Sequence, residues 1–216
     1  MRAKHTYRSP LRAEQAAATR DRILGALESI LKSGADLDAA SYKAIATRAG
    51  VREITVYRHF PNKVELLRAF WAWLNERRGN PTLARDESGL LAQVRSEFAA
   101  ADEIAPLIVA SLTSKEGREM QKSWNAERRA TLDEALGGMI GPVSGVERTR
   151  VLAILHLLMS AHAWHAMRDL WDLDGREAGE AVAWALATLF RDLQSGRRPR
   201  RKVRPAPASR PRRRAP

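Results

Sequence analysis

The segment that follows Ser41 constrains the fold most, because its turns and stops accommodate only two short helices. Ser41 itself is a suitable N-cap for a helix over about 42–49. Gly50 comes next, in Ala-Gly-Val, where a residue without a Cβ can take positive φ and reverse the chain. A second helix over about 52–59 is then ended by Pro61, and Asn62 caps a further helix that starts near Lys63. Two short helices joined by a glycine-containing turn are typical of the helix-turn-helix arrangement.

Helical patterning extends over the rest of the chain. Ala, Leu, Arg and Glu dominate, and β-branched runs with alternating polarity are scarce, so we expect an all-α fold of about nine helices. The other predicted helices cover residues 14–32, 63–78, 87–101, 105–114, 116–136, 146–171 and 175–194. The expected division of the chain is a basic N-terminal arm (1–12), a helix-turn-helix domain (13–62), a larger helical domain (63–195) and a disordered basic tail (196–216).

The last two predicted helices indicate a homodimer. Helix 146–171 is apolar nearly all round between residues 151 and 170, so it requires burial on more than one side. Helix 175–194 offers an apolar stripe, with Trp184 beside it; its members are Val182, Leu186, Leu189, Phe190 and Leu193. We expect these helices to pair with their symmetry mates in a four-helix interface.

Positive charge is concentrated at the two ends of the chain. The formal net charge is +12, and residues 195–216 carry ten Lys or Arg, five Pro and no acid. Residues 1–22 have a net charge of +4, whereas residues 23–194 have a net charge of −2. Basic ends commonly approach a polyanion, nucleic acid above all. The alternative is that the Arg-rich ends serve only solubility or follow from biased codon usage.

Several classes of site and location are disfavoured. The chain has no Cys, which excludes disulfides and thiol chemistry. The longest apolar stretch, 151–164, is shorter than the roughly 20 residues of a membrane span, and the N-terminus has no signal-peptide pattern. We therefore expect a cytoplasmic, nucleoid-associated protein without a membrane partner. His156, His162 and His165 share one predicted helix, but pocket-lining or interface roles explain them better than a metal site, and no cofactor or catalytic motif is present.

The helix-turn-helix segment also carries a specific motif. Its parts are Ile45-Ala46, Ala49-Gly50-Val51, Thr55-Val56-Tyr57-Arg58-His59-Phe60 and Lys63-x-x-Leu66. This pattern resembles the DNA-binding domain of TetR-family bacterial transcriptional regulators over about 50 residues, and the helical remainder is similar to the family's ligand-binding and dimerisation domain. The resemblance implies a sequence-specific DNA-binding regulator and no enzyme.

The resemblance also implies residue roles. Tyr57, His59 and Lys63, with Ser41 or Tyr42, stand where the family contacts the DNA backbone. The positions that face bases in at least some members are Lys43, Arg52, Glu53, Ile54 and Thr55.

Two positions depart from the family pattern. Arg52 replaces a frequent Ser N-cap, so the recognition helix lacks its usual capping hydroxyl. Ile54 replaces a small residue, and its side chain could contact a thymine methyl or merely pack. Packing inside a small domain is likewise the alternative for Tyr57 and His59.

The large C-terminal domain suggests control by a small molecule. Trp71, Met120, Trp124 and Trp164 are pocket candidates as a group, although core packing is the alternative for each one. The 105–136 region offers few cations outside the pairs Lys115/Arg118 and Arg128/Arg129, which look exposed, so we expect an apolar ligand. Members of this family are usually repressors that their ligand releases from a palindromic operator, and the resemblance implies the same here. The alternative is a ligand-independent or nucleoid-type DNA-binding protein in which the basic ends dominate.

Overall fold

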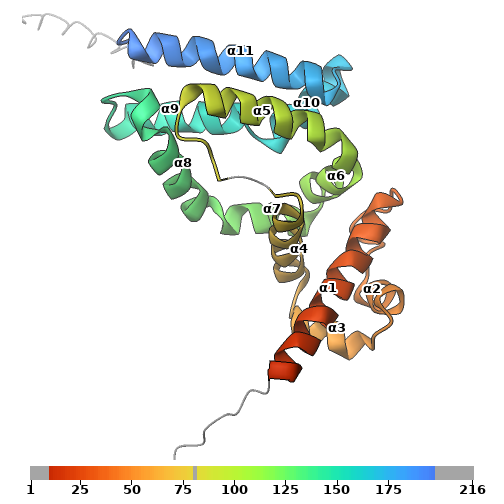
Figure 1. Cartoon of the computed structure of the whole chain (residues 1–216). Helices are drawn as coiled ribbons and strands as arrows, with labels where there is room; N and C mark the ends of the chain where they lie inside the picture. Colours follow the sequence, from red (N-terminus) through yellow and green to blue (C-terminus); the bar gives the residue numbers. More distant parts are fainter. Residues whose placement is uncertain (1–9, 80–81, 198–216) are drawn as a thin grey trace, which may run out of the picture.

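The computed structural model describes residues 10–79 and 82–197, and within these ranges it contains helices and no strand (Figure 1). The prediction of an all-α fold is therefore confirmed. The helices are α1 (Pro10–Lys32), α2 (Tyr42–Ala49), α3 (Glu53–His59), α4 (Lys63–Arg77), α5 (Glu87–Ala101), a 3₁₀ turn (Asp102–Ile104), α6 (Ala105–Thr113), α7 (Lys115–Ser123), α8 (Asn125–Ile140), α9 (Gly145–Leu158), α10 (Ala161–Trp171) and α11 (Gly175–Gln194).

Local capping chemistry sets the two short helices. The Ser41 side chain accepts a hydrogen bond from the Ala44 backbone N–H at the start of α2. Gly50 ends α2 with φ of 64°, and its N–H reaches the carbonyls one turn earlier. The helix boundaries and the turn predicted here are thus confirmed. Buried apolar side chains then join these helices to α1, among them Ile23, Leu27, Ile45, Val56 and Phe60.

Helix α4 connects this N-terminal group to the rest of the molecule. Its N-terminus follows α3 directly, and its cap, Asn62, accepts a hydrogen bond from the Glu65 N–H at 2.9 Å, as the sequence predicted. Further along, α4 packs against α1 and α7, while α1 also contacts α6. In Figure 1, α4 stands between the α1–α3 group and the upper layer of helices. A movement of α4 would therefore change its packing against both the N-terminal helices and the C-terminal domain.

Helices α5 and α11 form the tightest pair of the C-terminal domain and run antiparallel. The start of α11 lies at the end of α5, where the Gly175 N–H donates to Asp102 Oδ2 at 2.7 Å. Arg95 pairs with Glu180 along the helices, and the Gln194 amide donates to Glu87 near the other end. In Figure 1, α9 and α10 lie behind this pair, and α8 descends from them toward α4.

Three predicted boundaries were wrong. The helix expected over 116–136 is interrupted at Trp124, which gives α7 and α8. The helix expected over 146–171 is interrupted at Met159 and Ser160, because the Ser160 side chain caps a new helix by accepting from the Ala163 N–H. Helix α1 begins at Pro10 rather than near Glu14, so residues 10–12 of the expected arm are helical. These breaks raise the number of α-helices in the described residues from the expected nine to eleven.

The expected partner-facing stripe of the last helix was also wrong. Val182, Leu186, Phe190 and Leu193 are buried inside the same chain, where α11 packs on α5. Trp184, which the sequence placed beside the stripe, is instead 73% exposed. The face of α11 that remains available to a partner is therefore the one that carries Trp184.

Candidate nucleic-acid interface

The N-terminal helices present a hollow of about 320 Å³ where three helices meet. Its walls come from the start of α2, the exposed face of α3 and the start of α4. The lining residues are Ser41, Tyr42, Lys43, Glu53, Tyr57, Asn62 and Lys63. Six of them were predicted from the sequence as DNA contacts, and the seventh, Asn62, was predicted as a helix cap.

The hollow is suited to an anion because two helices begin at it. The N-termini of α2 and α4 carry partial positive charge and unpaired backbone N–H groups. Lys43 and Lys63 add two ammonium groups, whereas Glu53 is the single acid in the lining. A DNA phosphate is the anion that fits next to a recognition helix.

Tyr42 and Tyr57 have different positions at the hollow: Tyr42 is buried, and Tyr57 is exposed. Tyr42 is buried, and its hydroxyl donates to the Phe60 carbonyl oxygen at 2.9 Å. Burial, followed by the neighbouring Tyr57, raises the pKa of Tyr42 to about 12, so this hydroxyl remains a donor. The Tyr57 ring lies 4.5 Å from the Tyr42 ring and is 47% exposed. Of the two tyrosines, Tyr57 has the ring and hydroxyl at the surface.

Lys63 and His59 are both half-buried. The Lys63 Nζ donates to the Leu37 carbonyl oxygen at 2.9 Å, which positions the ammonium at the hollow. His59 lies outside the lining. Burial, with smaller effects of Arg58 and Arg20, lowers the pKa of His59 below its ordinary value.

The remaining predicted base-facing residues lie on the outer side of α3. Arg52 and Glu53 are exposed, Thr55 is half-exposed, and Ile54 is 69% exposed. Arg52 occupies the N-cap and makes no side-chain cap hydrogen bond, as the sequence predicted. Ile54 therefore does not pack into the core.

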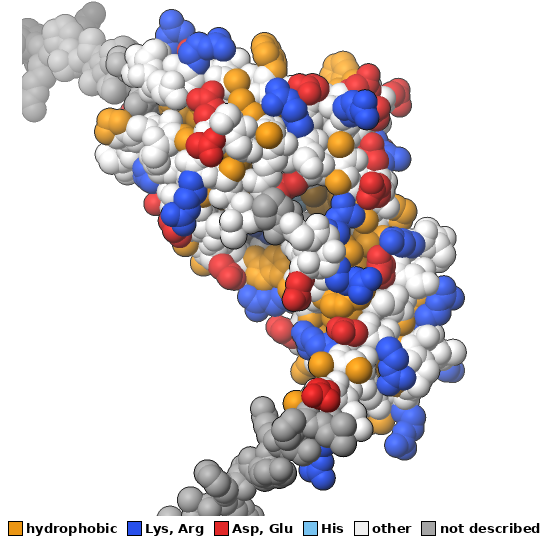
Figure 2. All heavy atoms as spheres, viewed as in Figure 1, with side chains coloured by type: hydrophobic (Ala, Val, Ile, Leu, Met, Phe, Trp, Pro, Cys, Tyr) orange, Lys and Arg blue, Asp and Glu red, His pale blue; other side chains and the backbone are white. Residues whose placement is uncertain are grey.

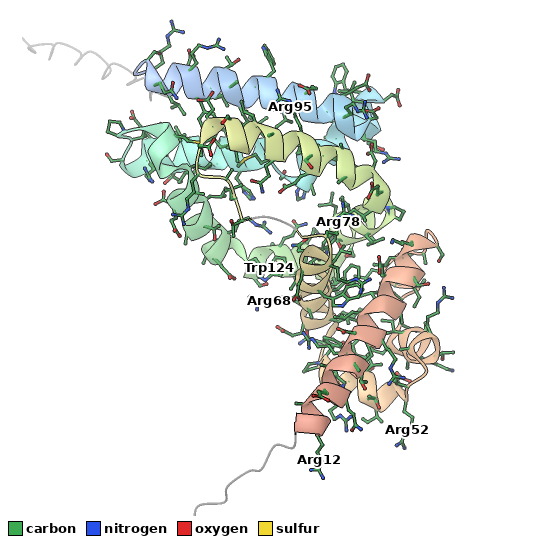
Figure 3. All side chains as sticks on the ribbon, viewed as in Figure 1. Arg12, Arg52, Arg68, Arg78, Arg95 and Trp124 are labelled. Carbon is green, nitrogen blue, oxygen red and sulfur yellow. The ribbon has the colours of Figure 1, made fainter. Side chains whose placement is uncertain are left out.

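Charge on this part of the surface is biased toward the positive. Figure 2 shows Lys and Arg side chains spread over the N-terminal helices, whereas acidic and basic side chains alternate over the C-terminal domain. Arg12 and Arg52 lie at the same end of these helices in Figure 3. The rest of the expected basic arm and nearly all of the basic tail lie outside the described residues.

The predicted pocket residues do not share one cavity. Met120 and Trp164 are buried, and the Trp164 indole N–H donates to Asp102 Oδ1 at 3.1 Å. The indole N–H of Trp71 donates to Ser111 Oγ at 3.0 Å. Trp124 lines an open cleft of about 460 Å³ between α4 and α8.

The rest of that cleft was not predicted. Its other lining residues are Arg68, Ala72, Glu127, Arg128 and Thr131. Arg128 was expected to be exposed but is half-buried, which the sequence could have indicated only if the break at Trp124 had been recognised. Arg68 and Trp124 lie beside each other in Figure 3, with the guanidinium 5.9 Å from the ring centroid.

A short recognition helix behind a glycine turn, with an anion-binding hollow beside it, defines a helix-turn-helix DNA-binding protein. Residues 31–70 match the family of bacterial regulatory proteins, tetR family. This match confirms the resemblance in the sequence and supports a TetR-family DNA-binding transcriptional regulator. No curated protein and no solved structure matches the chain. Among the described residues, no helix has the length and apolar character to cross a membrane.

Proposed function

We propose that the protein is a dimeric repressor that reads a palindromic operator through α3 and leaves it when a small molecule binds. The observation that carries the DNA-binding part is the hollow of Ser41, Lys43, Tyr57 and Lys63, which joins two helix N-termini and two ammonium groups. We assign Ser41, Tyr57 and Lys63 to the DNA backbone, and Lys43 to a base-facing position at the edge of the hollow. A DNA-binding regulator acts where the DNA is, so we place it in the cytoplasm, and we assign it no catalytic activity.

Base recognition falls to the exposed side of α3. Arg52, Glu53 and Thr55 offer polar groups to base edges, and the exposed Ile54 offers a methyl surface that suits thymine. Changes at these positions are expected to alter which sequence is preferred. Changes at Ser41, Tyr57 and Lys63 in the hollow are expected to weaken binding to every sequence.

Selection of duplexes from random DNA, followed by mobility-shift titration with the full-length protein, tests this assignment. The selected operator should be preferred over random DNA by at least about 10³-fold. The double variant Lys63→Gln/Tyr57→Phe should bind both DNAs more weakly and with a smaller salt dependence, because fewer phosphates are neutralised. Lys115→Gln is the matched control, since Lys115 is an exposed lysine on α7. Normal operator binding by the double variant would overturn the assignment, and the absence of sequence preference would favour a nucleoid-type protein.

The dimer proposal depends on exposed apolar side chains of α9, α10 and α11. They are Val146, Ile154, Leu157, Leu170, Trp171 and Trp184. Large side chains of this kind are enriched where a monomer surface becomes an interface. We expect a two-fold dimer that sets its recognition helices roughly 34–36 Å apart, or a multiple of one DNA turn. Sedimentation should show that the unaltered protein is a dimer at micromolar concentration and that Trp184→Glu weakens the dimer. A monomer of the unaltered protein at this concentration would refute the dimer proposal.

Ligand control is proposed through α4. This helix carries Lys63 at the DNA hollow and, about one and a half and two and a half turns later, Arg68 and Ala72 in the cleft. A molecule that fits the cleft in only one orientation of α4 would change the position of Lys63 through its higher affinity for that state. The proposal predicts that a cleft-binding compound releases the protein from its operator in the mobility-shift assay.

A further inference from the structure

The cleft between α4 and α8 contains a cation that no described residue of the chain neutralises. Arg128 is half-buried, and burial lowers the pKa of its guanidinium. Within the described part of the chain, this side chain has neither an ion pair nor a hydrogen bond. Removing a guanidinium from water without a partner is unfavourable, so an external anion at this position would be stabilised.

The charged groups near Arg128 do not supply that anion. Arg128 and Arg129 both lower the pKa of the half-buried His156 of α9, so the charges that act on this histidine are positive. Glu127 is the single acid in the lining, but it is 78% exposed and lies 4.0 Å from Arg68. An exposed pair at that distance is weak, and it can yield to a stronger partner.

The other walls of the cleft are suited to an apolar body. Trp124 contributes an aromatic ring, with Arg68 above it, and Ala72 and Thr131 contribute methyl groups. The volume of about 460 Å³ lies within the range of small-molecule sites. A flat or aliphatic group would therefore have a surface to pack on while a charged end faced the arginines.

We propose that the cleft binds small organic acids, with the carboxylate on Arg128 and Arg68 and the apolar body against Trp124 and Ala72. A planar guanidinium matches a carboxylate with two parallel hydrogen bonds, which gives both strength and orientation. This replaces the apolar ligand expected from the sequence with an amphipathic one. The inference rests on the proposed ligand control, because it names the ligand class for that site.

Calorimetric titration of the full-length protein without DNA tests the ligand class. The probes are 2-naphthoate, indole-3-acetate and decanoate, each compared with its neutral amide. For at least one acid, the dissociation constant should be at least about tenfold lower than that of its amide. Arg128→Gln should weaken that acid about tenfold, and Arg129→Gln should not, although it removes the same charge from the next, exposed position.

A second readout does not depend on a variant that folds. An anion on Arg128 offsets its repulsion of His156, so the pKa of His156 should rise when the acid binds, while the amide should leave it unchanged. Proton NMR titration of the unaltered protein measures this, with His156→Gln to assign the signal. Equal binding of acids and amides, equal losses in both arginine variants, or no acid binding below about 1 mM would overturn the proposal.

The operator assay separates this failure from failure of ligand control. Acid binding without operator release would leave the ligand class standing and refute the control of DNA binding. Operator release by the amides alone would keep the control and refute the ligand class.

Discussion

Glycines serve different purposes in the N-terminal helices and in the C-terminal domain. Gly50 reverses the chain with positive φ, and a Cβ added there would meet no atom within 4 Å. Gly175 and Gly117 lie where helices cross, and a Cβ added to either would overlap a backbone carbonyl oxygen, that of Phe98 or of Ser111. Gly50 therefore serves a local turn, whereas Gly117 and Gly175 allow close contact between helices.

This difference determines what each region tolerates. A residue in a turn can be replaced by another that accepts the same φ. A glycine in a close helix contact cannot be replaced by a larger residue without moving one of the helices. In the C-terminal domain, the Asp102 carboxylate also orients the helices, because it accepts hydrogen bonds from the Trp164 and Arg168 side chains and from the Gly175 N–H. Helices α5, α10 and α11 are thus held together around one carboxylate.

The largest effect is expected from Gly175→Ala. The added methyl group would overlap the Phe98 carbonyl and approach Asp102 Oδ2, so α11 must shift away from α5. Overpacking of this kind typically costs about 1–3 kcal/mol, and backbone neighbours place this site at the upper end. Urea unfolding measures the loss.

Gly138→Ala in α8 is the matched control, because its Cβ would meet nothing within 4 Å and its φ is not positive. The free energy of unfolding of this control should increase by about 0.5–1 kcal/mol, since alanine is the better helix former. If Gly175→Ala is as stable as the unaltered protein, the crossing is looser than the structure shows.

A smaller loss is expected from Gly50→Ala in the turn between α2 and α3. Alanine pays a steric penalty of about 1–2 kcal/mol in the left-handed region, although there is space for its methyl group. Gly50→Asn should lose less, because asparagine accepts this conformation more readily. Thermal unfolding of the two variants separates conformation from packing, and equal losses would contradict the assignment.

Local caps explain which helices the sequence could predict, in both regions of the molecule. The bounds of α2, α5 and α11 were predicted correctly, and α2 and α11 begin at side-chain caps on Ser41 and Asp174. The break at Trp124 has no side-chain cap, proline or glycine to mark it. The break before α10 has a cap, Ser160, but it lies within an apolar run that reads as one helix. The sequence pattern alone therefore marks neither break clearly.

The two candidate sites divide in the same way. The DNA hollow was predictable because its residues lie within one motif of local helix starts. The cleft was not, because Arg68 and Arg128 come together only through the packing of α4, α7 and α8. Likewise, the burial of the α11 stripe depends on α5, which lies far away in the sequence.

A stabilising change is expected at the start of the recognition helix. Arg52 has the extended backbone of an N-cap, with φ −77° and ψ 146°, but no capping hydrogen bond. Arg52→Ser would supply the missing acceptor, and such caps contribute about 0.5–1 kcal/mol. Arg58→Ser is the control, because it removes the same charge within α3 where no cap is needed. A gain in melting temperature for Arg58→Ser alone would show that charge, and not capping, limits α3.

The smallest effect is expected from two histidines, one in each region. Burial lowers the pKa of His156 most, with Arg128, His162 and Arg129 adding to it, and burial also lowers that of His59. The folded protein therefore favours their neutral forms, and the unfolded chain binds more protons as the pH falls. Their contribution to stability is complete above the ordinary histidine pKa of about 6.5 and decreases below it. The free energy of unfolding should fall between about pH 7 and pH 5, with a smaller slope in His156→Gln and in His59→Gln. His165→Gln serves as the control, and an unchanged slope in both variants would show that neither histidine resists protonation in the fold.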